Sequence, residues 1–190
     1  DNKNDSGNSN GVDENNNVKS ELELVELIVP VSLRAMFFVY YLVYAGVEVG
    51  FFGWIATYAL ATVTTSESMA AYLVSLFFVS LTFGRLLAIP LAAWVPNQHM
   101  LRFQFGVTII ASILSITIMP ISYATACIVT CIMGYGVSSL FPLGLTIPQD
   151  YGFEVNSKVI SFCVMGATIG ETVIPFLVGM IMGSTGARAM

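Results

Sequence analysis

Five long apolar runs occupy most of the sequence after residue 33, and they decide what the chain can fold into. The runs lie at about 34–63, 69–95, 101–119, 122–147 and 158–182. Each exceeds the roughly 18 apolar residues that suggest a membrane-spanning helix. Inside a bilayer each segment must satisfy its own backbone hydrogen bonds, and a single apolar segment does so as an α-helix. The sequence therefore predicts an all-α membrane protein with five transmembrane helices.

The charge content agrees with a membrane protein and argues against other classes. Only 10% of the residues are charged, whereas soluble domains carry about 25%. Lysine and arginine form no cluster, so nucleic acid is not an expected partner. The three cysteines lie in apolar runs, where small buried thiols are the expected state. With one histidine in the chain, His99, we expect no metal site, no cofactor and no enzymatic activity.

Residues 1–32 differ in composition from the rest of the chain. Residues 1–20 are rich in Asn, Asp, Gly and Ser, and they contain too little apolar surface to fold. Residues 1–30 hold seven acidic residues and two lysines, a net charge of −5, whereas residues 31–190 hold five acids and five bases. The sequence predicts two parts: a disordered, acidic and Asn-rich linker at 1–32 and a transmembrane helical domain at 33–190.

The basic residues predict the orientation of the helices. If the five runs alternate in direction, Lys19, Arg34, Arg102 and Lys158 lie on one side of the membrane and Arg188 lies on the other. Basic residues are enriched on the cytoplasmic side. We therefore expect a multi-pass integral membrane protein with a cytoplasmic linker. Five spans leave the other end outside, so we expect the complete protein to have a sixth span.

Three charged residues, Glu48, Arg85 and Glu171, lie near the middle of apolar runs. Glu48 follows Arg34 by 14 residues, or about 21 Å along a helix. A charge at that depth strongly disfavours insertion, so it marks a functional site or an ion-pair partner. Arg85 requires a counter-charge, and both acids qualify. The pair could fix helix register permanently; we favour a role in ligand binding or switching, because a buried ion pair stabilises poorly compared with apolar packing.

Aromatic residues accompany Glu48. Tyr41, Tyr44 and Glu48 are spaced i, i+3 and i+7, so they share one helix face, and Phe51 and Phe52 continue it. A carboxylate among aromatic rings suits a sugar, because the acid accepts hydroxyl hydrogen bonds and the rings stack on the apolar sugar face. Plain packing against neighbouring helices explains the rings equally well, and both interpretations stay open.

Small residues spaced four apart lie near two of the charges. Around Glu48 they predict either close helix packing or a broken helix whose freed backbone groups face a cavity. Near Glu171 they predict a helix that packs closely and bends at a proline. In the run at 122–147, the small and hydroxyl residues before Phe141 and Pro142 also predict close approach and a bend. The residues that we assign to helix packing and hinging are Gly46, Gly50, Gly166, Gly170 and Pro175.

Four strings carry a resemblance to a known family: YAGVEVGFFGWIATYAL at 44–60, FGRLLAIPLA at 83–92, SSLFPLGLTIPQDYG at 138–152 and GATIGETVIPFLVGMIMGSTG at 166–186. With these strings the chain resembles the C-terminal half of a major facilitator superfamily (MFS) transporter. The branch it resembles contains the sodium-dependent glucose transporter 1-like proteins and is related to the fucose permeases. That family places an acid between glycines in helix seven, Gly-Arg in helix eight, Phe-Pro in helix ten and Gly-Glu in helix eleven.

The resemblance implies an architecture and a function. The runs would be helices seven to eleven of a half-bundle, with helix twelve missing, and 1–32 would end the loop between two halves. The function would be uptake of a hexose-like sugar, coupled to sodium or a proton, by alternating access together with the N-terminal half. The candidate substrate-binding residues are Glu48, Tyr44, Phe52, Trp54 and Arg85, and the candidate coupling-ion or ion-pair residues are Glu48, Arg85 and Glu171. Alternatives are a non-transporting receptor or scaffold of the same fold and an MFS carrier of a different small solute.

Overall fold

The computed structural model describes residues 31–150 and 157–186. The predicted disordered linker lies outside the described residues, except for its last two residues, which begin the first helix. All the packing discussed below lies within the compact unit Phe37–Met190.

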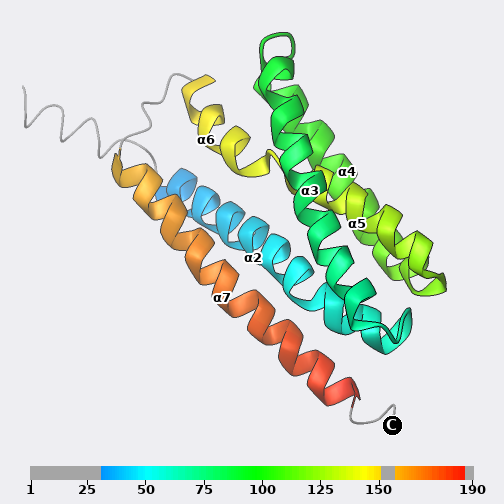
Figure 1. The fold of residues 1–190 in the computed structure, drawn as a ribbon. Helices are drawn as coiled ribbons and strands as arrows, with labels where there is room; N and C mark the ends of the chain where they lie inside the picture. Colours follow the sequence, from blue (N-terminus) through cyan, green and yellow to red (C-terminus); the bar gives the residue numbers. More distant parts are fainter. Residues whose placement is uncertain (1–30, 151–156, 187–190) are drawn as a thin grey trace, which may run out of the picture. The chain divides into compact units, whose positions relative to one another are not determined.

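The described residues form helices and no strand, and five apolar spans account for nearly all of them. In chain order the elements are α2 (Val31–Thr62), α3 (Glu67–Ala92), α4 (Asn97–Thr117), the short 3-10 helix η1 (Met119–Ile121), α5 (Tyr123–Val137), α6 (Leu140–Asp150) and α7 (Ser157–Gly186) (Figure 1). The stretches long and apolar enough to cross a membrane are Leu33–Thr62, Glu67–Ala92, Asn97–Ile121, Tyr123–Asp150 and Val159–Gly183. The prediction of an all-α membrane protein with five spans is therefore confirmed.

The chain turns between the third and fourth spans at Pro120. α4 ends at Thr117, and Pro120 lies in η1. Ser122 then caps α5: its side chain accepts a hydrogen bond from the Thr125 backbone N–H, and the Thr125 side chain accepts from the Ser122 N–H. This reciprocal capping satisfies N–H groups that the first turn of a helix leaves without partners. Pro120 thus ends one span and does not kink a continuous helix.

α2 and α7 pack closely because glycines remove side chains from their interface. A Cβ atom added at Gly166 would lie 2.7 Å from the Phe38 carbonyl oxygen, and one added at Gly170 would overlap the Leu42 carbonyl. The contacts advance by four residues along both helices, so the two helices run parallel, as Figure 1 also shows. At Gly166 and Gly170 the backbone of α2 therefore lies where a larger residue would place its side chain.

The first apolar run contains no helix break. α2 is continuous through Gly46 and Gly50, so the interpretation of this segment as a broken helix is wrong. Glycine permits an unusual backbone conformation but keeps its N–H, so it does not force a break. Gly46 admits Ile174 of α7, because a Cβ at position 46 would overlap that side chain. Gly50, in contrast, makes only an ordinary contact with Ile174.

α3 and α5 meet in the same way. A Cβ at Gly134 would lie 2.6 Å from the Phe77 carbonyl oxygen, and the Ser80 hydroxyl donates a hydrogen bond to the Cys131 carbonyl at 2.6 Å. Phe77 is fully buried where the two helices cross. Apolar burial does not drive helices together inside lipid, so backbone approach and hydrogen bonds of this kind carry the association.

Substitution of Gly170 tests the close contact between α2 and α7. Gly170→Ala would place a methyl group against the Leu42 backbone carbonyl, which cannot rotate away. Overpacking of this kind destabilises a protein by about 1–3 kcal/mol, so the midpoint of thermal unfolding in detergent is expected to fall. Gly183→Ala is the matched control on the same helix, because nothing lies within 4 Å of its added Cβ. Equal midpoints for the two variants would contradict the described interface.

Candidate functional site

The fourth span is broken between α5 and α6, at the bend predicted from the sequence. α5 ends at Val137 and α6 begins at Leu140. Pro142 has no backbone N–H, so the Ser138 carbonyl four residues earlier loses its helical donor. A backbone group without a partner in hydrocarbon destabilises the structure by several kcal/mol, and other elements must therefore satisfy it.

Two side chains hold the peptide group at this break. The Arg85 Nε–H of α3 donates a hydrogen bond to the Ser138 carbonyl at 3.0 Å. The Ser139 N–H donates to Gln104 Oε1 of α4, also at 3.0 Å. Ser138 and Ser139 share one peptide bond, so Arg85 and Gln104 bind the carbonyl and the N–H of the same peptide group.

Three tyrosines of α2 bind other carbonyls around the break. The hydroxyls of Tyr40 and Tyr41 donate to the carbonyls of Leu140 at 2.8 Å and Phe141 at 3.0 Å. The Tyr44 hydroxyl lies 3.2 Å from the Val137 carbonyl. Tyr41 and Tyr44 do share a face, as their spacing predicts, and both are buried. Their hydroxyls lie within hydrogen-bonding distance of backbone carbonyls of the broken helix, so this face of α2 packs against the backbone at the break.

Glu48 joins this arrangement through Tyr44 and Arg85. The Tyr44 hydroxyl donates to Glu48 Oε2, and Arg85 Nη2 lies 3.9 Å from Glu48 Oε1. The Glu48 side chain is 17% exposed, and that of Arg85 is 52% exposed. Of the two candidate partners, the structure pairs Arg85 with Glu48. Glu171 is exposed on α7.

Two other candidate residues lie in aromatic or helix-helix contacts. The Phe52 ring packs against Phe77 and Phe78, with centroid distances of 5.9 and 5.0 Å. The Trp54 Nε1–H donates to the Pro175 carbonyl of α7 at 2.9 Å, and its ring covers Gly179. The structure therefore brings Glu48, Tyr44 and Arg85 together, whereas Trp54 is bonded to α7.

The face of α3 that carries Arg85 is open. Ser75, Phe78 and Thr82 share the Arg85 stripe and are exposed. An open groove of about 430 Å³ runs along this side of α3, lined by Phe78, Val79, Thr82, Phe83 and Leu86. The α7 stripe that leads to Glu171 is exposed as well, through Ser161, Val164 and Thr168. Both polar stripes face outward from the packed helices.

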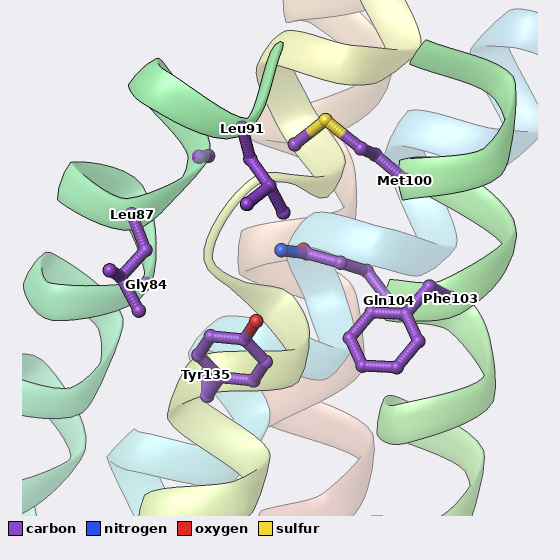
Figure 2. A pocket seen from close by; sticks show the side chains of 8 residues that line it. Gly84, Leu87, Leu91, Met100, Phe103, Gln104 and Tyr135 are labelled. Carbon is purple, nitrogen blue, oxygen red and sulfur yellow. The ribbon is translucent and has the colours of Figure 1, made fainter. Parts of the chain in front are cut away.

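A small cavity lies on the other side of the break, next to Gln104. Its volume of about 20 Å³ is that of a single ordered water. Figure 2 shows the Gln104 side chain pointing from α4 toward α3, between Leu91 and Tyr135. The lining residues are Gly84, Leu87, Ala88, Leu91, Met100, Phe103, Gln104 and Tyr135. Across residues 31–150 and 157–186, no group of three or more His, Cys, Asp or Glu side chains gathers as a metal site would.

Similar proteins identify the family. Major facilitator superfamily domain-containing protein 4A of Danio rerio is 33% identical over 144 residues, which cover 75% of this chain and 27% of that protein. Sodium-dependent glucose transporter 1 is 33% identical in Danio rerio over 141 residues, 74% of this chain and 23% of the relative. In Xenopus laevis it is 31% identical over 150 residues, 78% of this chain and 30% of the relative. This chain belongs to the major facilitator superfamily.

The match covers only part of each MFS relative. The chain spans about a quarter to a third of the length of these proteins. No family model matches the sequence, and no solved structure does. The family assignment therefore rests on these relatives together with the five described spans.

Sequence reasoning missed Gln104 and Tyr40 in this MFS chain. Gln104 lies in an apolar run with about 4% of its surface exposed. A buried amide in a membrane helix requires hydrogen-bond partners, as the buried carboxylate of Glu48 does. That signal was present in the sequence, although an amide is weaker than a charge. Tyr40 gives no such signal, because a tyrosine in an apolar run is explained equally well by packing.

Replacement of Arg85 by lysine tests the shared contact with Ser138 and Glu48. Lysine keeps the charge but lacks the planar fork that reaches two acceptors at once. Arg85→Lys is expected to lower stability by about 1–2 kcal/mol, because the buried Ser138 carbonyl loses its donor. The midpoint of thermal unfolding measures this. Arg102→Lys, at an exposed position on α4, is the control and should leave the midpoint unchanged; an equal effect of both changes would count against the site.

Proposed function

We propose that this chain forms helices seven to eleven of a secondary active transporter, within the C-terminal half-bundle of an MFS protein. Its solute is a hexose-like sugar whose uptake is coupled to sodium or a proton through alternating access with an N-terminal half. The linker at 1–32 is cytoplasmic in this proposal. The observation that carries it is the bonding of Glu48, Tyr44 and Arg85 to one another and to the break between α5 and α6.

A charge pair joined to a broken helix suits a transporter. Transporters place their binding sites near the middle of the membrane, where discontinuous helices expose backbone groups to the ligand. Glu48 and Arg85 lie in the inner part of their spans, and each also contacts the break or a residue bonded to it. A solute or ion that binds Glu48 therefore changes the hydrogen bonding of a helix junction.

Aromatic surface beside the pair suits a sugar. Phe78 lies two turns before Arg85 on the open face of α3, and its ring packs against Phe52 at 5.0 Å. The half-exposed Arg85 and the Glu48 carboxylate offer a donor and an acceptor for hydroxyl groups, while the Phe78 ring offers an apolar stacking face. Tyr44 contributes indirectly, because its hydroxyl is already engaged with Glu48 and Val137.

The names of the relatives also support a sugar as the solute. Two of the three relatives described above are sodium-dependent glucose transporters, which favours a sugar as solute and sodium as coupling ion. Glu171 offers a second carboxylate within the membrane-spanning helices for a coupling cation. The other relative, a domain-containing protein 4A, carries no solute in its name. A carrier of a different small solute is therefore the second candidate.

Neutralising Glu48 tests the proposal in the full-length protein. Glu48→Gln removes the charge that pairs with Arg85 while keeping the shape of the side chain, so accumulation of labelled sugar against its gradient is expected to be lost. Uptake into cells or proteoliposomes is measured with and without a sodium or proton gradient. Glu67→Gln, in the exposed first turn of α3, is the matched control and should retain uptake.

Two outcomes would reject the proposed site or function. Unchanged uptake kinetics in Glu48→Gln would remove Glu48 from the site. Binding of hexoses in a thermal-shift screen of the wild-type protein, without accumulation against a gradient, would indicate a receptor or scaffold of the same fold.

A further inference from the structure

Gln104 has polar partners for both ends of its amide, and both partners lie at the break. Its Oε1 accepts from the Ser139 N–H at 3.0 Å, and its Nε2 lies 3.4 Å from Ser138 Oγ. The side chain is about 4% exposed in the middle of α4. Burial of an amide is unfavourable unless its groups are paired, so its place in the apolar α4 depends on this break.

The helix itself offers no acceptor for the Ser139 N–H. In a regular helix this N–H would bond to the Tyr135 carbonyl. That carbonyl instead accepts from the Ser138 N–H at 3.3 Å and from Ser138 Oγ at 2.7 Å. Gln104 therefore supplies the acceptor for the N–H side of the Ser138–Ser139 peptide group.

The carbonyl side of the same peptide group leads to the charge pair. The Ser138 carbonyl accepts from Arg85, and Arg85 in turn faces Glu48. A peptide group is planar, so the direction of its N–H fixes the direction of its C=O. Hydrogen bonds on the two sides of one peptide also polarise each other and become stronger together. A continuous series of interactions thus joins Gln104 on α4 to Glu48 on α2.

We propose that Gln104 is a positioning residue for the Glu48–Arg85 site. By holding the Ser139 N–H it keeps the Ser138 carbonyl directed at Arg85, and this anchors the guanidinium beside Glu48. Gln104 contacts neither solute nor ion in this proposal. Its role rests on the proposed function of Glu48 and Arg85, whereas the hydrogen bonding can be tested separately.

Hydrogen exchange of the full-length protein in nanodiscs tests the first step. Gln104→Leu keeps the volume but removes the acceptor, so exchange in residues 138–141 is expected to become about tenfold faster, the effect of losing one buried hydrogen bond. Gln104→Glu, whose carboxyl group is kept neutral by burial in the apolar span, retains an acceptor oxygen at the same reach and is expected to retain slow exchange. Ser112→Ala, which removes a hydroxyl bonded within α4 to the Thr108 carbonyl, is the matched control. Unchanged exchange in Gln104→Leu, or equal acceleration in Gln104→Glu, overturns the proposal.

Coupling between Gln104 and Glu48 tests the second step. The shifts in thermal midpoint are compared for Glu48→Gln, Gln104→Leu and the double variant. Residues that act through one network give non-additive shifts, whereas independent residues give additive ones. We expect the double variant to lose less than the sum, and the pair Glu48→Gln with Ser112→Ala to be additive. Additive shifts for Gln104 and Glu48 overturn the proposal.

The two steps do not depend on transport. If Glu48→Gln leaves sugar uptake unchanged, the proposed function fails, while exchange and coupling still decide whether Gln104 positions Arg85. If exchange and coupling behave as expected and Glu48→Gln abolishes uptake, Gln104→Leu is expected to reduce uptake and Gln104→Glu to restore it.

Discussion

A backbone hydrogen bond that proline removes from the middle of a membrane helix organises the polar part of this structure. Pro142 leaves the Ser138 carbonyl without its helical donor, and hydrocarbon offers no water to replace it. Arg85 from α3 supplies the donor that this carbonyl lost. Gln104 from α4 binds the N–H of the same peptide group, and tyrosines from α2 bind neighbouring carbonyls. Side chains that look unrelated in the sequence thus meet at one break.

Glycines make this arrangement possible. A Cβ at Gly84 would overlap the Ser138 side chain, and one at Gly144 would lie 2.7 Å from the Tyr41 hydroxyl. A Cβ at Gly136 would lie 2.8 Å from Thr108 Oγ1 of α4. Each glycine leaves room for a neighbouring element at the break. In the Gly-Arg pair of α3, the glycine lets the helix approach and the arginine beside it supplies the donor.

The sequence was sufficient for the spans and for the residues with the strongest physical signal. Hydropathy located all five spans, and the unfavourable burial of charge singled out Glu48 and Arg85. It did not decide which run is broken. Gly46 and Gly50 permit a break, whereas Pro142 removes a hydrogen bond. The helix is continuous at the two glycines and is broken before the proline.

The hydrogen-bond partners of Trp54 and Gln104 could not be predicted from the sequence, because they depend on tertiary packing. The family resemblance implies that Trp54 is a substrate-binding residue. Its indole N–H bonds to the Pro175 carbonyl on α7, more than a hundred residues away, and no sequence pattern indicates that contact. Gln104 likewise bonds to the Ser138–Ser139 peptide group, which belongs to another span and is not indicated by the sequence around Gln104.

Tyr44 connects the charge of Glu48 to the break. Its hydroxyl carries one proton and faces two acceptors, the Glu48 carboxylate and the Val137 carbonyl. It can donate to one of them at a time. A proton on Glu48, or a solute hydroxyl bonded to it, makes the Glu48 carboxyl group a weaker acceptor for the Tyr44 hydroxyl. The Tyr44 hydroxyl then donates to the Val137 carbonyl. Occupancy of Glu48 and the hydrogen bonding of α5 are therefore linked by a single hydroxyl group. Under the proposed function, that link gives a bound ligand differential contacts with two arrangements of the broken helix, which a ligand-driven conformational change requires.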